Sequence, residues 1–156
     1  MKVCQHLWFE RDMEAALRFY VSLIPGSSLG FLSTVPADTP SGPAGTIKFA
    51  AFTLGDQRYR AIEAGPFDPS SRNFSIMVAC DSQAEIDRLW AALADGGKEI
   101  ACGWLTDRWG ITWQITPQRL LDLVGDPDRA KGKRVMEAMM KMVKLDIDAL
   151  EAAANG

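Results

Sequence analysis

The sequence predicts an α+β fold made of two similar strand-helix modules and a helical tail. Its 156 residues, 47% of them hydrophobic, suit one globular domain. An apolar strand followed by an amphipathic helix occurs twice, and when the halves are aligned Arg18 falls on Arg88 and Tyr20 on Trp90. We expect a first module at about 1–65, a second at about 72–117 and a tail at 118–156.

The first module has the pattern β-α-β-β-β. Residues 3–9 form a short apolar run, Asp12 can cap the helix that follows, and Pro25-Gly26 ends this helix. A Pro/Gly/Ser-rich loop lies at 36–45. Three further strands are predicted at 28–35, 46–54 and 58–64.

The second module repeats the strand and the helix but looks shorter. Residues 73–80 are strand-like, Asp81 or Ser82 can cap the helix, and Gly96-Gly97 ends it. Only 98–102 and 110–116 then have strand character, so we expect β-α-β-β, with 104–109 in the loop of the last hairpin.

The tail is predicted to be helical. Asp126-Pro127 suits an N-cap with a first-turn proline, and a final helix is expected from Asp146 or Asp148. Its basic side chains are expected on a solvated face and its methionines against the sheet or a dimer partner. The predicted apolar face holds Val135, Met136, Met139, Met140 and Val143.

Composition narrows the function classes. A net charge of −3 disfavours nucleic acids and anionic membranes as partners, and no apolar run approaches the roughly 20 residues of a membrane span. Three cysteines without CxxC spacing and no signal-peptide pattern predict a reducing cytoplasm. The single histidine, His6, argues against most hydrolase triads and His-rich metal sites.

Several motifs carry a family resemblance: a strand ending in LWF, an AALRFY helix followed by Pro-Gly-Ser, a GPAG loop, and CGWLTDRWGITWQI followed by DPDRAKGKRVMEAMMKM. With these the chain resembles the PhnB-like, 3-demethylubiquinone 3-methyltransferase-like branch of the vicinal oxygen chelate superfamily, which has the glyoxalase and bleomycin-resistance fold. The resemblance implies paired βαβββ modules that curl their sheets, as a curved sheet or barrel, around a cavity, usually in a homodimer. Metal-dependent members place ligands on the first and last strands of each module.

Carried over residue by residue, the resemblance puts Gln5, Glu63, Ser75 and Gln114 at the corners of this cavity. Only Glu63 is charged, so we expect no intrinsic metal; the alternative is a divalent cation held by Gln5, Glu63 and Gln114. Glu63 is the candidate catalytic base, provided that burial raises its pKa.

Strand alternation from these corners assigns further residues to the cavity and turns His6, Cys4 and Trp8 away, although a register error of one residue would reverse this. The cavity residues added in this way are Leu7, Phe9, Ala61, Met77 and Thr112.

Trp104 and Arg108 are open to two interpretations. An Asp107–Arg108 pair can fix the loop over aromatic side chains, or Arg108 can recognise an acidic ligand group on which the tryptophans stack. For Cys102 a structural role is favoured over a nucleophilic one, because no further histidine is present as its base.

Two functions follow from these assignments. One is a small-molecule binder without a cofactor, for an apolar ligand with a polar head. The alternative is a metal-dependent isomerase, lyase or dioxygenase with Glu63 as ligand or base. The third interpretation, a methyltransferase, is disfavoured because this chain has no GxGxG turn after its first strand.

Overall fold

A computed structural model of the chain describes residues 4–39, 41–66 and 74–156. The chain divides into two compact units, Met1–Pro69 and Ser70–Gly156. The division falls between the two modules that the sequence predicts.

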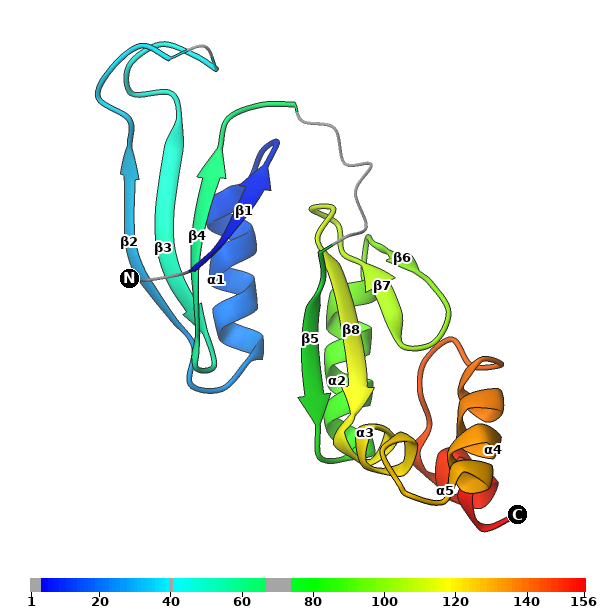
Figure 1. Ribbon diagram of the computed structural model, residues 1–156. Coiled ribbons are helices and arrows are strands. Elements are labelled where there is room, and N and C mark those ends of the chain that lie inside the picture. Colours follow the sequence, from blue (N-terminus) through cyan, green and yellow to red (C-terminus); the bar gives the residue numbers. More distant parts are fainter. Residues whose placement is uncertain (1–3, 40, 67–73) are drawn as a thin grey trace. The chain divides into compact units, whose positions relative to one another are not determined.

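Unit 1 has the predicted element order (Figure 1). Its four strands form one open sheet in the order β1-β4-β3-β2, in which β1 runs parallel to β4 and the other pairs are antiparallel. The elements are β1 (Gln5–Phe9), α1 (Met13–Leu23), β2 (Ser28–Thr34), β3 (Lys48–Leu54) and β4 (Gln57–Glu63).

The core of unit 1 lies between α1 and one face of this sheet. The helix buries Met13, Ala16, Leu17 and Tyr20, and the Tyr20 ring lies 6.5 Å from that of Phe9 on β1. Because side chains alternate along a strand, the residues between the buried ones point to the other face, which α1 does not cover. The sheet side of the core consists of Leu7, Phe9, Ala50, Phe52, Leu54, Tyr59 and Ala61.

Unit 2 repeats this topology, with the strand order β5-β8-β7-β6 and β5 parallel to β8. The internal repeat is therefore confirmed, and neither four-stranded sheet closes into a barrel within the described residues. The elements are β5 (Ile76–Cys80), α2 (Gln83–Ala94), β6 (Lys98–Glu99), β7 (Trp104–Thr106) and β8 (Thr112–Pro117).

The predicted β-α-β-β pattern of the second module is wrong, because three strands follow α2. Two of them are short: β6 has two residues and β7 has three. Between them Cys102 and Gly103 belong to no strand, and their backbone N–H groups donate to the carbonyls of Met142 and Val143. Trp104, expected in a loop, lies on β7.

The helix α2 begins at the second of the two caps that the sequence allows. The Ser82 hydroxyl accepts from the Glu85 N–H at 3.3 Å, and the Glu85 carboxylate accepts from the Asp81 N–H at 2.8 Å. Its apolar side, Ile86, Leu89, Trp90 and Leu93, is buried together with Trp113 and Ile115 of β8.

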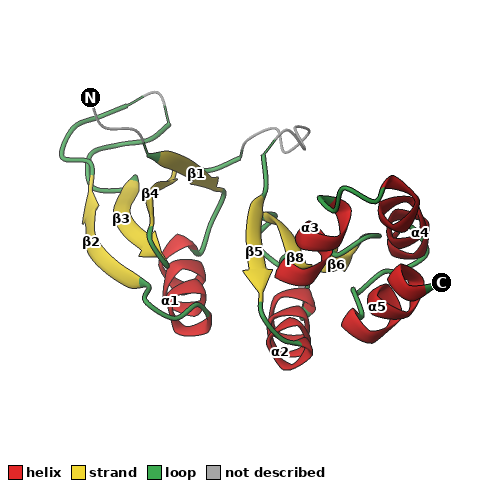
Figure 2. Ribbon diagram, turned by 60° about the horizontal axis from the view of Figure 1, so that its bottom comes forward, coloured by secondary structure: helices red, strands yellow, loops and turns green. Residues whose placement is uncertain are grey.

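The tail forms three helices that belong to unit 2 (Figure 2): α3 (Gln118–Val124), α4 (Arg129–Met139) and α5 (Ile147–Asn155). Their apolar cluster comprises Leu120, Leu123, Val135, Leu145, Leu150 and Ala154. Of the predicted apolar face, Val135 is buried and Met139 packs on the cluster, whereas Met136, Met140 and Val143 are exposed.

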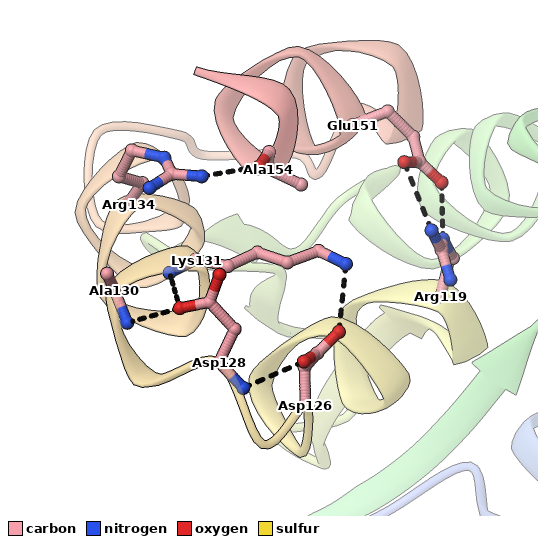
Figure 3. A network of polar contacts seen from close by, with 8 residues as sticks. All are labelled: Arg119, Asp126, Asp128, Ala130, Lys131, Arg134, Glu151 and Ala154. Carbon is pink, nitrogen blue, oxygen red and sulfur yellow. Dashed lines mark hydrogen bonds and ion pairs between the residues drawn. The ribbon is translucent and has the colours of Figure 1, made fainter.

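Polar contacts join the three tail helices (Figure 3). Arg119 of α3 pairs with Glu151 of α5, and the Arg134 guanidinium donates to the last carbonyls of α5, at Ala153 and Ala154. The predicted cap of α4 is corrected: Asp128 accepts from two N–H groups of the first turn, whereas Asp126 binds the Asp128 N–H and the Lys131 ammonium. For α5 the cap is Asp146, one of the two expected.

No helix in the described part of the chain is both long enough and apolar enough to cross a membrane.

Candidate functional site

A pocket of about 260 Å³ opens on the sheet of unit 1. Ala51, Thr53, Arg58 and Arg60 in its lining alternate with the core residues of β3 and β4, so their side chains point to the face that α1 leaves uncovered. The core residues Phe52 and Tyr59 also border it. The lining includes Cys4, Gly30, Ala51, Thr53, Arg58 and Arg60.

Small residues explain why the sheet is hollow here. The pairing of β2 with β3 is irregular between Leu29 and Phe31, so Gly30 lies at a bulge-like position. A Cβ on Gly30 would lie 3.0 Å from the carbonyl oxygen of Ala51. Glycine and alanine therefore form a floor beside the larger side chains of Phe31 and Arg60.

Two arginines of β4 stand beside this floor. Arg58 and Arg60 are separated by one residue, so they share the uncovered face, and both are exposed. The Arg60 guanidinium carbon lies 5.1 Å from the Phe31 ring centroid, a cation-π contact. Neither arginine has a carboxylate partner among the described residues.

Hydroxyl groups complete the polar part of the pocket. Ser28, Thr53 and Arg58 are neighbours in one row across the sheet. The Thr53 hydroxyl accepts from the Ser28 N–H and lies 3.0 Å from the Ser28 hydroxyl. One hydroxyl proton is used between the two side chains, which leaves the other for a ligand.

The predicted cavity residues of the first module lie on the other face. Leu7, Phe9 and Ala61 are 3%, 0% and 1% exposed and form the core against α1. The predicted alternation is correct, but the choice of face is wrong, and His6, which was expected to face away, shares the pocket face with Arg60, its partner in the β1–β4 register. The reason is that the more apolar face of the sheet packs on the helix.

The internal repeat gives a different correspondence when the strands rather than the helices are aligned. The connection from β1 to α1 is one residue longer than the connection from β5 to α2. An alignment based on the helices therefore sets Gln5 on Ser75, whereas the strand ends set Phe9 on Cys80. With the parallel registers β1–β4 and β5–β8, Arg60 then corresponds to Gln114.

Glu63 stabilises the start of α1. One carboxylate oxygen accepts from the Met13 N–H at 2.7 Å, and the other accepts from the Lys48 ammonium at 2.7 Å. Asp12, the predicted cap, has a left-handed backbone (φ 59°) and no capping hydrogen bond from its side chain. Glu63, the register partner of Phe9 at the end of β1, thus caps α1 from the neighbouring strand β4.

The pKa of Glu63 is lowered. Burial raises this pKa, but the hydrogen bonds from Lys48 and the Met13 N–H, together with the charge of Lys48, lower it by more than burial raises it. The condition for Glu63 as a general base, a pKa raised by burial, is therefore not met.

In unit 2 the predicted residues share the face that α2 leaves uncovered. The Gln114 amide donates to the Ser75 hydroxyl at 2.7 Å, so two of the expected corners are in contact. Met77 and Trp104 are the neighbours of Gln114 in the sheet, and Met77 is 49% exposed. Thr112 alternates with the buried Trp113 and lies on the same face.

The Asp107–Arg108 segment stabilises a turn. The buried carboxylate of Asp107 accepts from the N–H groups of Trp109 and Ile111 and from the Trp113 indole N–H. Arg108 donates to Asp95 at the end of α2, at 2.5 Å, and its guanidinium carbon lies 5.3 Å from the Trp109 ring centroid. Arg108 thus pairs with Asp95, whereas the sequence suggested Asp107 as its partner, and the contacts of Arg108 and of Asp107 both suit a structural role.

The proposed metal ligands do not suit a divalent cation. Both oxygens of Glu63 are engaged, and the amide of Gln114 is bonded to Ser75. Within 4–39, 41–66 and 74–156, no three His, Cys, Asp or Glu side chains lie close enough to bind one ion.

Together, the repeated βαβββ units with uncovered sheet faces define an α+β protein of the glyoxalase-like, vicinal oxygen chelate class. The chain belongs to the 3-demethylubiquinone-9 3-methyltransferase family, whose model matches residues 1–116. No curated protein sequence matches it significantly.

Several solved structures are similar to it, among them two bacterial proteins. A putative 3-demethylubiquinone-9 3-methyltransferase, PhnB protein, from Bacillus cereus is 30% identical, with a TM-score of 0.62 over 75% of this chain and 99% of its own. A protein from Pseudomonas aeruginosa is 25% identical, with a TM-score of 0.56 over 75% of this chain and 97% of its own. The family model ends before α3, so the three tail helices lie beyond it.

The pocket residues Arg58, Arg60, Gly30 and Ala51 were missed at the sequence level. A signal was present in the segment RYRAIE, where the arginines alternate with Tyr59 and Ala61. Had the apolar set been assigned to the helix-covered face, both arginines would have been placed on the opposite one.

Proposed function

We propose that this protein binds a small organic molecule in the pocket of unit 1, without a metal or cofactor of its own. The observation that carries the proposal is the hollow over Gly30 and Ala51 on the uncovered sheet face. Its volume of about 260 Å³ lies just below the roughly 300–1,000 Å³ of sites for drug-sized ligands, which favours a small metabolite.

The side chains of this pocket suit binding better than catalysis. Arginine remains protonated near neutral pH, so Arg58 and Arg60 offer hydrogen-bond donors and charge but no general base. Glu63 accepts from Met13 and Lys48, which supports a structural role for it.

Binding is tested by thermal-shift screening of small metabolites against the purified protein, with Ala51→Phe as the pocket-filling variant. We expect hits that stabilise the wild type saturably and lose their effect in Ala51→Phe. Ala91→Phe, at an exposed position of α2 in unit 2, is the control for an added ring and should retain the hits. Hits that bind Ala51→Phe equally well would refute this site.

The proposed absence of a metal has its own test. Elemental analysis of the purified protein should find less than stoichiometric transition metal, and chelation should leave ligand binding unchanged. A stoichiometric metal whose removal abolished turnover of a bound compound would favour the enzyme instead.

The family description gives one observation in favour of methyl transfer. Saturable stabilisation by S-adenosylmethionine, lost in Ala51→Phe, would support that activity over simple binding. We further propose a homodimer in the cytoplasm; light scattering coupled to gel filtration would give the assembly state.

A further inference from the structure

We propose that the ligand head group is an oxyanion, a carboxylate or a phosphoryl group, bound between Arg58 and Arg60. This inference rests on the proposed function, because it names the chemistry of the ligand for the same pocket.

The first argument is charge. The chain as a whole carries −3, so two neighbouring arginines without a carboxylate partner in the described residues are not a consequence of general basicity. Some basic side chains elsewhere in the structure do have such partners: Lys48 pairs with Glu63 and Lys131 with Asp126. The pocket is therefore a local site of positive charge.

The second argument is geometry. Residues two apart on a strand have Cα atoms about 7 Å apart on one face, so Arg58 and Arg60 can approach one small anion from two directions. Contact with the Phe31 ring restrains the Arg60 guanidinium and leaves its in-plane N–H groups free for a planar oxyanion.

The third argument is the remaining donor. The row Ser28–Thr53–Arg58 sets the two hydroxyls beside the first arginine, and one hydroxyl proton stays available. Two guanidinium groups and a hydroxyl together donate hydrogen bonds, and carboxylate and phosphoryl oxygens are suitable acceptors for them. A neutral ligand would leave both positive charges without a partner.

Cys4, which is exposed and lines the pocket, serves as a reporter of this charge. Its alkylation rates by iodoacetate and iodoacetamide are measured by mass spectrometry and normalised to N-acetylcysteine. We expect the anionic reagent to be favoured severalfold at Cys4, with the preference reduced by salt and in Arg58→Gln or Arg60→Gln. Cys80 controls for unfolding, because burial raises its pKa to about 11 and hides its thiol.

Binding is measured with two acids, benzoate and phenylphosphonate, and with neutral benzamide, by protection of Cys4 from iodoacetamide and by thermal shift. We expect the acids to protect Cys4 and benzamide not to, and each arginine substitution to weaken acid binding about tenfold. The two acids separate a carboxylate from a phosphoryl preference. Arg129→Gln, an exposed change on α4, is the matched control and should leave binding unchanged.

The outcomes separate the two proposals. If benzamide protects Cys4 as well as benzoate does, and Ala51→Phe abolishes both effects, the pocket binds ligands but the oxyanion inference is overturned. An iodoacetate preference at Cys4 equal to that of N-acetylcysteine would overturn it too. If neither acid nor amide protects Cys4 and the metabolite screen gives no hit sensitive to Ala51→Phe, both proposals fail.

Discussion

At the scale of single residues, Glu63 connects the end of β4 with the start of α1. Its two oxygens have different partners, the Met13 N–H and the Lys48 ammonium. Lys48 is 44% exposed, so solvent screens the ion pair, and the helix cap is the larger contribution to stability.

We predict that Glu63→Gln lowers the free energy of unfolding by about 1 kcal/mol at pH 7. The pKa of Glu63 is lowered below 4.5, so its contribution is present above pH 4.5 and is lost as the pH falls through the folded-state value. The pKa of Lys48 is raised above 10.5, so the pair also weakens only above that pH.

Urea unfolding of both proteins between pH 3 and pH 8 checks this. The difference in the free energy of unfolding between the wild type and Glu63→Gln should shrink toward zero at the acid end of this range. Glu14→Gln is the control, because Glu14 forms an exposed pair with Arg18 and should matter by at most about 0.5 kcal/mol. A Glu63→Gln effect that does not depend on pH would contradict the assigned role.

A second single residue that stabilises the structure is Asp107, which lies among tryptophans in the sequence. Three N–H groups donate to its carboxylate, one of them from the fully buried Trp113. We predict that Asp107→Ala destabilises the protein by about 3 kcal/mol, because buried donors lose their acceptor. Unfolding followed by tryptophan fluorescence is the measurement, and Asp95→Ala, at a 74% exposed partner of Arg108, should change stability by less than about 1 kcal/mol.

At the scale of elements, the turn from α2 into β6 needs a residue without a side chain. A Cβ on Gly97 would lie 2.3 Å from the carbonyl oxygen of Thr106 and 3.0 Å from the Cα of Asp107, both backbone atoms. The end of α2 therefore packs directly on the neighbouring strand.

We predict that Gly97→Ala destabilises the protein by about 2 kcal/mol, since the backbone of β7 must move. Gly132→Ala is the matched comparison: it lies inside α4, and its nearest neighbour would be 3.6 Å from the new Cβ. There alanine should stabilise by about 0.5–1 kcal/mol through helix propensity. Thermal unfolding of both variants should show shifts of opposite sign.

At the scale of the whole molecule, the chain combines a family region with three added helices. The tail contacts this region through the backbone of Cys102 and Gly103, whose N–H groups donate to Met142 and Val143. Leu145, fully buried, fills the space beside Gly103. The tail is therefore part of the structure of unit 2.

We predict that Leu145→Ala lowers stability by about 2–5 kcal/mol, as other buried leucine truncations do. Deletion of residues 118–156 should destabilise unit 2 further, because the apolar surface that Leu145 covers is then exposed to water and two backbone hydrogen bonds are lost. Met140→Ala, at a 59% exposed position of the same tail, is the control and should have little effect. Unchanged unfolding of the truncated chain would instead indicate an independent tail.

The sequence predicted much of the fold, but the pocket residues Gly30, Ala51, Arg58 and Arg60 were not among the predicted site residues. Ser82 and Asp146 were each one of two caps that the sequence allowed, because a cap acts within one helix turn. The contact between Ser75 and Gln114 depends on the pairing of β5 with β8, which is a tertiary contact. The main error concerns the face of the first sheet. Strand alternation from the corners that the resemblance gave placed Leu7, Phe9 and Ala61 in the cavity, whereas the structure buries them in the core.

By itself the sequence determined the order of elements, the internal repeat and the family, since local periodicity, turn residues and motif spacing encode them. The tertiary structure alone decided which face of each sheet its helix covers, because that choice depends on contacts between segments far apart in the chain. For the same reason it alone showed that Glu63, 50 positions after Met13, caps α1. It also showed that Gly30, Ala51, Arg58 and Arg60 meet at one pocket.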